Sequence, residues 1–134
     1  MTVVVDTSAL YAVVDADDAR HHDATTTWSR LADAGDTELL ITNYVVVEVI
    51  SLISRRLGME VARQVQRVAI AAMTTCWTTP LEHAAAMEAF LGSGRALSFV
   101  DCATMVTMRA RELSTIFTFD DDFARAGFRT LGGA

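Results

Sequence analysis

The sequence contains no lysine. All 11 basic residues are arginines, and 17 acidic residues give a net charge of −6. The missing lysine excludes mechanisms that need an ammonium group, such as a phosphate-binding P-loop or a Schiff base. The two cysteines, Cys76 and Cys102, are too few for a disulfide framework or a zinc knuckle, so we expect buried thiols in a reducing cytosol. The three histidines are poorly placed for a zinc site or a catalytic triad.

Proline and glycine are also scarce, and no long hydrophobic run is present. The single proline and seven glycines leave no linker or low-complexity segment, and 134 residues predict a single domain, 1–134. The apolar start has no basic residues and is interrupted by Asp6 and Asp15, so it is neither a signal peptide nor a membrane span. We therefore expect a cytoplasmic protein with a substantial core, since 51% of its residues are hydrophobic.

Short apolar runs alternate with longer helical patterns along the chain. The expected strands are Thr2–Val5, Glu38–Ile41, Cys76–Thr79, Thr115–Phe119 and Phe128–Leu131. The expected helices cover residues 7–14, 18–34, 43–57, 59–73, 81–91, 98–113 and 121–126. This alternation predicts a three-layer α/β/α fold around a central, mostly parallel five-stranded sheet. Ligands of such sheets bind beyond the carboxyl ends of the strands.

Acidic residues follow or flank several of these strands. Asp6 follows the first strand, Asp120 follows the fourth, and Asp101 lies in the first turn of a helix that Ser98 begins. Helix capping explains each of these three residues when it is taken alone. Glu48 has no capping role, because it interrupts an apolar helix two turns after its start. It therefore needs a partner, and an ion pair with Arg55 is the structural alternative to a functional role.

Taken together, the four acids predict a cation. Carboxylates that converge on one edge of a sheet repel each other, by about 4 kcal/mol for two charges ~4 Å apart at an effective dielectric near 20. A divalent metal removes this conflict, and a set of oxygen ligands suits Mg²⁺ or Mn²⁺. Such ions, when they retain open positions, act on phosphate groups.

Four segments carry a family resemblance. VVVDTSAL, TNYVVVEV, SFVDCATMVTMRAREL and IFTFDDDF resemble, in this order, the signatures of PIN-domain ribonucleases. More narrowly, they resemble the VapC-type toxins of toxin–antitoxin pairs, from about Val3 to Leu131. The resemblance implies a Mg²⁺-dependent endoribonuclease, with Mn²⁺ as a substitute. It also implies that structured RNA, either tRNA or rRNA, is cleaved by a metal-activated water.

The family's site residues transfer to this sequence by position. The acidic quartet corresponds to four residues: Asp6, Glu48, Asp101 and Asp120. Asp122 is a further possible ligand, and the run of three aspartates leaves open which of them is the fourth acid. The family's small hydroxyl positions correspond to Ser8, Thr42 and Ser98, which would orient carboxylates or metal-bound water in addition to capping helices. The resemblance also implies a homodimer and an antitoxin that covers the active-site groove.

The net charge of −6 argues against a nucleic-acid enzyme, although the four site acids account for most of it. The expected RNA contacts are Arg55, Arg56 and Arg95, each of which could equally be a solvated surface residue. The main alternative function is a catalytically silent PIN-fold module that only binds a partner. A phosphohydrolase of the haloacid dehalogenase type is disfavoured, because Ser8 stands where that class needs a second aspartate.

Overall fold

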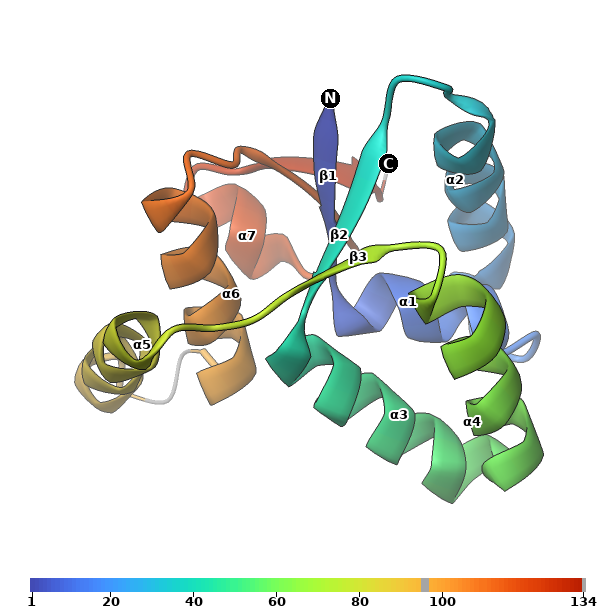
Figure 1. The fold of residues 1–134 in the computed structure, drawn as a ribbon, viewed down its shortest axis with the longest axis horizontal. Coiled ribbons are helices and arrows are strands. Elements are labelled where there is room, and N and C mark those ends of the chain that lie inside the picture. Colours follow the sequence, from blue (N-terminus) through green and yellow to red (C-terminus); the bar gives the residue numbers. More distant parts are fainter. Residues whose placement is uncertain (95–96, 134) are drawn as a thin grey trace.

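A parallel five-stranded sheet forms the centre of the molecule (Figure 1). The computed structural model describes residues 1–94 and 97–133. All four strand pairings are parallel, in the order β3-β2-β1-β4-β5, which confirms the predicted fold class. The strands are β1 (Thr2–Val5), β2 (Glu38–Thr42), β3 (Thr74–Cys76), β4 (Thr115–Thr118) and β5 (Arg129–Gly132).

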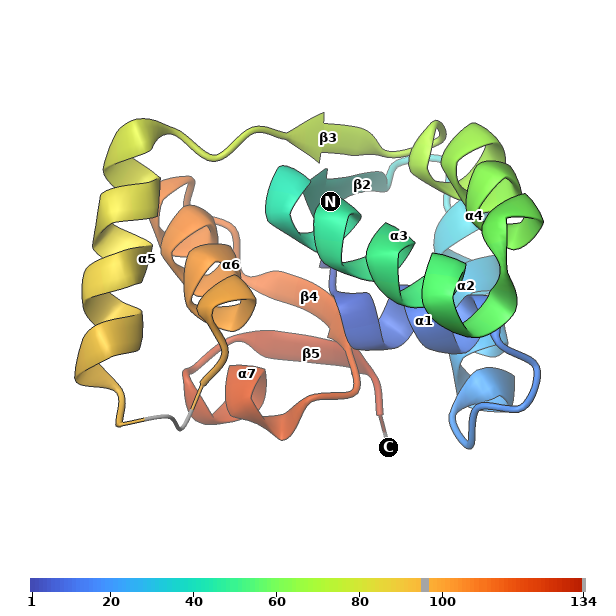
Figure 2. The ribbon, with the colours of Figure 1, turned by 90° about the horizontal axis from the view of Figure 1, so that it is seen from below.

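Helices cover both faces of this sheet (Figures 1 and 2). The first face carries α1 (Thr7–Val14), α2 (His21–Asp33), α3 (Asn43–Leu57) and α4 (Met59–Val65), which continues into a π-helical turn (Gln66–Ile70). The opposite face carries α6 (Phe99–Ala110) and α7 (Asp121–Arg125). The remaining helix, α5 (Pro80–Gly92), packs on the outer side of α6 (Figure 2).

The alternation of side chains along the strands separates two hydrophobic cores. Val3 and Val5 of β1 belong to the core under α1–α4, whereas Val4 between them belongs to the core under α6 and α7. Ile116 and Phe117 of β4 divide between the two cores in the same way. Successive residues of a strand point to opposite faces, so a continuous apolar run is the expected signature of a strand buried on both sides.

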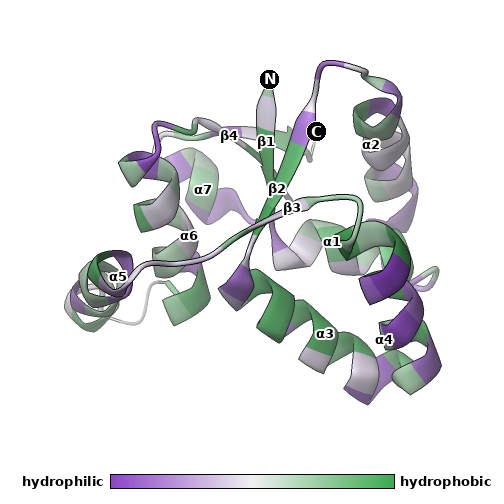
Figure 3. Cartoon of the chain, viewed as in Figure 1, coloured by the Kyte–Doolittle hydropathy of each residue, from purple (hydrophilic) through white to green (hydrophobic). Residues whose placement is uncertain are grey.

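Helix α3 has a valine-rich sequence but forms a helix as predicted. Val45, Val49 and Ile53 recur at intervals of four residues and are fully buried, so packing of this apolar stripe outweighs the β preference of valine. Figure 3 shows this helix mostly green, with purple at its two ends. Gly58, at φ 95°, ends it. Within the described residues, no helix combines the length and apolarity that are needed to cross a membrane.

The third strand lies earlier in the chain than predicted. The prediction was Cys76–Thr79, whereas β3 covers Thr74–Cys76. The two threonines that follow have other partners. The amide of Thr78 donates to Asn43 Oδ1 at 2.8 Å, and the side chain of Thr79 caps α5. Cys76 and Cys102 are free and buried, as expected.

Helices α2 and α6 are both shorter than predicted, and the local conformation of the chain explains where each of them stops. Helix α2 begins at His21 rather than at residue 18, because Asp15 and Asp18 accept hydrogen bonds from backbone amides two residues further on, which bends the chain. Helix α6 ends at Ala110 rather than at residue 113. Glu112 there adopts φ 56°, a left-handed conformation that cannot continue the helix.

The start of α5 provides a test of the local energetics. Thr79 and Glu82 form a reciprocal capping box, in which each side chain accepts a hydrogen bond from the other residue's amide, at 3.1 and 2.8 Å. We expect Thr79→Ala to lower the free energy of unfolding by about 1 kcal/mol, whereas Thr79→Ser should retain most of it. Urea denaturation of both variants measures this difference. Equal loss in both variants would contradict the capping role.

The strand order places one edge of the sheet at a switch point. From β1 the chain proceeds through β2 to β3 on one side and then returns to place β4 on the other side. The amide of Asp6 donates to the carbonyl of Phe117 at 3.0 Å, so the carboxyl ends of β1 and β4 are joined. Ligands of parallel sheets bind at such a point.

Candidate active site

Three aspartates lie at this switch point, each at the amino end of a helix. Asp6 precedes α1, Asp101 lies in the first turn of α6, and Asp120 precedes α7. The partial positive charge at a helix amino terminus favours nearby carboxylates. The fold therefore assembles negative charge from segments that are far apart in the sequence.

Asp6 is a buried carboxylate held by two hydroxyl groups. Its side chain is 3% exposed, and its Oδ2 accepts hydrogen bonds from Ser8 Oγ at 2.9 Å and Thr118 Oγ1 at 2.8 Å. It forms no side-chain capping bond to α1, so the capping interpretation of this residue is wrong. Burial raises the pKa of Asp6 even though these hydrogen bonds favour the ionised form.

The two hydroxyl groups also fix the turn that follows β4. Ser8 Oγ accepts from the amide of Phe119 at 3.0 Å, and Thr118 Oγ1 accepts from the amide of Asp120 at 3.0 Å. Asp6 is thereby connected to Asp120 through a single hydroxyl. Thr118 belongs to the IFTFDDDF segment, but the sequence predicted no role for its side chain. Its position two residues before Asp120 was the signal that could have suggested one.

Asp101 is partly buried and close to other negative charge. Burial, and then the charge of Asp6, raise the pKa of Asp101 to about 6. Ser98 Oγ accepts from the amide of Asp101 at 3.1 Å, so Ser98 caps α6. Hydrogen bonding from Ser98 to the Asp101 carboxyl group lowers its pKa and so offsets part of the rise.

Three aspartates form a group that could hold a metal ion: Asp101, Asp120 and Asp122. Each offers one carboxylate oxygen, and these three oxygens lie within 4.8 Å of one another. Asp120 Oδ1 also accepts from the amide of Asp122 at 2.9 Å, and Asp122 Oδ1 pairs with Arg125 at 2.8 Å. All three aspartates are partly exposed, so an ion from solvent can reach them. Asp121 is exposed and outside this group.

Glu48 lies on α3, outside this group of three. It is half-buried and borders a groove that α3 forms with α5 and α6. Among the described residues no ion pair joins it to Arg55, so the structural alternative proposed for Glu48 is wrong. Thr42, the hydroxyl residue predicted nearby, caps α3 by accepting from the amide of Val45 at 3.2 Å.

The donor set fits a hard divalent cation. The converging atoms are carboxylate oxygens, the ligands that Mg²⁺ and Mn²⁺ prefer. Without an ion, the pKa values of Asp101, in this group, and of Asp6, beside it, are raised, because burial and nearby negative charge disfavour their charged forms. A bound cation would reverse both effects.

Of the three arginines expected to contact RNA, two lie within the described residues. Arg55 and Arg56 are exposed in the last turn of α3, where the Arg56 guanidinium lies 5.4 Å from the centre of the Tyr11 ring. Arg95 lies outside the described residues. Arg20 was not predicted; it stacks over Phe119 at 5.4 Å and lines a cavity of about 190 Å³ together with Asp120. Nothing in the local pattern around Arg20 indicated this position.

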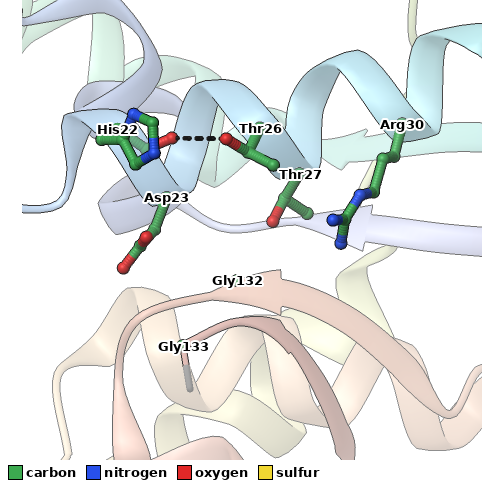
Figure 4. A pocket seen from close by; sticks show the side chains of 7 residues that line it. All are labelled: His22, Asp23, Thr26, Thr27, Arg30, Gly132 and Gly133. Atoms are coloured by element: carbon green, nitrogen blue, oxygen red, sulfur yellow. Dashed lines mark hydrogen bonds between the residues drawn. The ribbon is translucent and has the colours of Figure 1, made fainter.

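A second polar cavity lies between α2 and the end of β5 (Figure 4). It has a volume of about 330 Å³, and Asp23 and Arg30 are its charged acid and guanidinium. In Figure 4 the dashed line is the bond from Thr26 to the carbonyl of His22, which stays within α2. Asp23 is the one carboxylate among the residues that line this cavity, so the cavity does not resemble the metal-binding group of three aspartates.

Comparison with known proteins agrees with this geometry. The sequence profile of the family described as "PIN domain" matches residues 3–129. The chain belongs to the PIN domain family. A curated protein, the 23S rRNA-specific endonuclease VapC20 of Mycobacterium tuberculosis, is 31% identical over 128 residues, which cover 94% of this chain and 95% of that protein.

Solved structures show the same PIN domain fold. The crystal structure of M. tuberculosis VapC20, described as a sarcin–ricin loop cleaving toxin, superposes with a TM-score of 0.83 at 28% identity, covering 94% of this chain and 95% of that one. VapBC2 from Rickettsia felis, bound to promoter DNA, superposes with a TM-score of 0.72 at 12% identity, covering 97% of each chain. At that identity the second likeness concerns the fold alone.

Proposed function

We propose that this PIN domain is a divalent-metal-dependent endoribonuclease and the toxin of a toxin–antitoxin pair. The convergence of the Asp101, Asp120 and Asp122 oxygens within 4.8 Å, beside the buried Asp6, carries this proposal. The name of the relative, a 23S rRNA-specific endonuclease, supports the reaction class. Asp6, Glu48, Asp101 and Asp120 are the proposed catalytic acids, with Asp122 as a further ligand. We place the enzyme in the cytoplasm and treat residues 1–134 as one domain.

The protein residues position one another before any RNA binds. Ser8 and Thr118 donate to the same oxygen of Asp6, Oδ2, so the other oxygen of that carboxylate receives neither of these bonds. The aspartates after β4 are fixed by α7 and its cap. Asp101, Asp120 and Asp122 would hold Mg²⁺, or Mn²⁺ in its place, with Asp6 beside them and Glu48 at the side of α3. When bound, the ion supplies a charged centre that neutralises the phosphodiester and lowers the pKa of water.

The proposed substrate is structured RNA, and the relative favours ribosomal RNA over tRNA. The exposed side chains of Arg55, Arg56 and Arg20 can contact RNA phosphates, and Arg20 lines the same cavity as Asp120. Ser98 and Thr42 fix the helices that carry Asp101 and Glu48, and in this way determine where those acids lie.

The proposed partner is a small antitoxin that covers the active-site groove. The net charge of −6 favours a basic partner. A separate groove of about 610 Å³, which none of the proposed acids lines, runs between α2, α4 and the end of α1, and its apolar lining, which includes Trp28 and Val68, offers further area for a partner. VapBC from Salmonella typhimurium, bound to DNA, shares the fold at 12% identity.

We also propose a homodimer, supported by the exposed apolar side chains of α5, Leu81 and Leu91.

The test is cleavage of total RNA by the purified protein, free of antitoxin, with Mg²⁺, with Mn²⁺ and with EDTA. We expect discrete fragments with either ion and none with EDTA, because the carboxylates require a cation to act on phosphate. End mapping of the fragments identifies the RNA that is cut. No cleavage with either ion, combined with no effect of the ions on melting temperature, would favour the silent binding module instead.

A further inference from the structure

An apolar groove lies directly beside Glu48 and does not belong to the group of aspartates. It has a volume of about 390 Å³, and residues of three helices line it: Tyr44, Val47 and Glu48 of α3, His83 of α5, and Phe99 and Val100 of α6. We call it the aromatic groove. Val47 is 65% exposed at its edge, an unusual exposure for a valine on an otherwise packed helix.

The three rings of the aromatic groove hold one another in place. The centre of the Phe99 ring lies 6.0 Å from that of Tyr44 and 5.5 Å from that of His83. A hydrogen bond joins the Tyr44 hydroxyl and His83 Nδ1. Phe90 packs against the rear of Phe99 at 5.7 Å. The groove is therefore preorganised, which lowers the entropy cost of binding a flat ligand.

The position of His83 depends on a tie between α5 and α6. The neighbouring residue, Glu82, is buried and accepts two hydrogen bonds from Arg111, from Nε at 3.2 Å and from Nη2 at 3.0 Å. This bidentate ion pair holds the start of α5 against the end of α6. His83 and Phe99 consequently face each other across a fixed interhelical contact.

The aromatic groove is continuous with the proposed catalytic acids. Glu48 belongs to both, and Phe99 and Val100 directly precede Asp101 on α6. A helix rises only about 1.5 Å per residue, so an RNA phosphate at Asp101 would bring an adjacent nucleotide to this groove. The acids by themselves contact only phosphate, which carries no sequence information.

We propose that the aromatic groove binds one unpaired RNA base next to the cleaved phosphodiester, and that Tyr44 and Phe99 determine which RNA is cut. This inference rests on the proposed ribonuclease function. Proteins recognise looped RNA by stacking splayed bases on aromatic side chains and bonding their edges. The rings provide the stacking surfaces, while the His83 imidazole and the Glu48 carboxylate provide polar atoms for the base edge. A purely aliphatic protein side chain would leave those polar atoms without partners.

The test compares RNA hairpins of the sarcin–ricin loop sequence, intact or with a single abasic site at each position flanking the cut. We expect the wild-type protein with Mg²⁺ to lose about tenfold in kcat/KM at one abasic position, mainly through KM. Phe99→Leu should lose about tenfold on the intact hairpin and cleave the intact and abasic hairpins equally. Tyr44→Phe keeps the aromatic ring, so its kcat/KM should still fall about tenfold between the intact and the abasic hairpin. Met59→Ala, an exposed apolar residue outside the groove, is the matched control.

A further variant and the pattern of cleavage distinguish a failure of the base-binding inference from a failure of the proposed ribonuclease function. If Phe99→Leu does not fold, Val47→Glu, which changes an exposed residue, should also remove the difference between intact and abasic hairpins. Wild-type cleavage that is equal on all hairpins overturns the base-binding inference and leaves the ribonuclease function intact. A difference that persists in both groove variants also overturns it, and reduced antitoxin binding by those variants would then identify a protein side chain as the occupant. An absence of cleavage on every RNA overturns the function itself.

Discussion

Replacing Asp101 with asparagine should abolish RNA cleavage while the fold is retained. Asp101 shares the site with Asp120 and Asp122, whose oxygens lie within 4.8 Å of one of its own. The amide of asparagine has nearly the same shape but no negative charge, so it weakens the attraction for a divalent cation. Because the cation contributes several kcal/mol to phosphate chemistry, we expect kcat to fall at least about a hundredfold. Quantified cleavage of purified RNA at saturating Mg²⁺ measures the loss.

The neighbouring aspartate run provides a matched control for this prediction. Asp121 is exposed and outside the group of three, so Asp121→Asn should keep wild-type activity. Asp120→Asn and Asp122→Asn then distinguish the two remaining candidates for the fourth acid. The proposed site would be wrong if Asp101→Asn kept its activity, or if Asp121→Asn lost as much as Asp101→Asn. Far-ultraviolet circular dichroism of every variant checks that the fold is intact.

The same substitution should stabilise the protein when no metal is bound. The pKa of Asp101 is raised from 3.8 to about 6 by burial and by the charge of Asp6. An ionised Asp101 is therefore unfavourable in the folded state at pH 7. After allowance for its partial exposure, we expect Asp101→Asn to increase the free energy of unfolding in EDTA by about 1–2 kcal/mol at pH 7. Urea denaturation measures this gain.

The dependence on pH follows from the direction of the shift. Between pH 3.8 and about 6 the folded protein binds more protons at Asp101 than the unfolded chain does. The contribution of Asp101 to stability therefore falls as pH rises through this window and stays low above it. The advantage of Asp101→Asn should be small near pH 4 and complete at pH 7.

Two comparisons check this explanation of the stability gain. Asp121→Asn should show no comparable gain at either pH. Saturating Mg²⁺ should stabilise the wild-type protein, by about 2.7 kcal/mol at a hundred times the Kd, but not the variant. A gain for Asp101→Asn that is larger at pH 4 than at pH 7 would rule out charge repulsion as its cause.

Local sequence patterns predicted the elements that carry the acids. A buried valine run followed by Asp6 identifies the end of β1, since continuous apolar runs are typical of strands buried on both faces. Ser98 identifies the start of α6 through its capping bond to the amide of Asp101. In both cases the signal lies within a few residues, so the sequence contains it directly.

Contacts between distant segments were not predictable from these patterns. The hydroxyl of Thr118 approaches Asp6 only because β4 pairs beside β1, a consequence of topology and not of any local motif. The surroundings of Glu48 include His83, which an ion pair at the other end of α6 holds in place. The alternative pairing of Glu48 with Arg55 is absent for the same reason, because helical spacing shows which residues share a face but not which side chains meet there.

The hydrogen bond between Thr118 and Asp6 joins positions 112 residues apart, and this separation bears on how the protein is made. Synthesis proceeds from the amino terminus, so a chain that has reached only the end of α5 contains Asp6 and Glu48 but neither Asp101 nor Asp120. Such a nascent chain cannot assemble the acidic site, whatever part of it has already folded. A ribosome that makes this protein is therefore shielded from the proposed activity until both Asp101 and Asp120 have been synthesised.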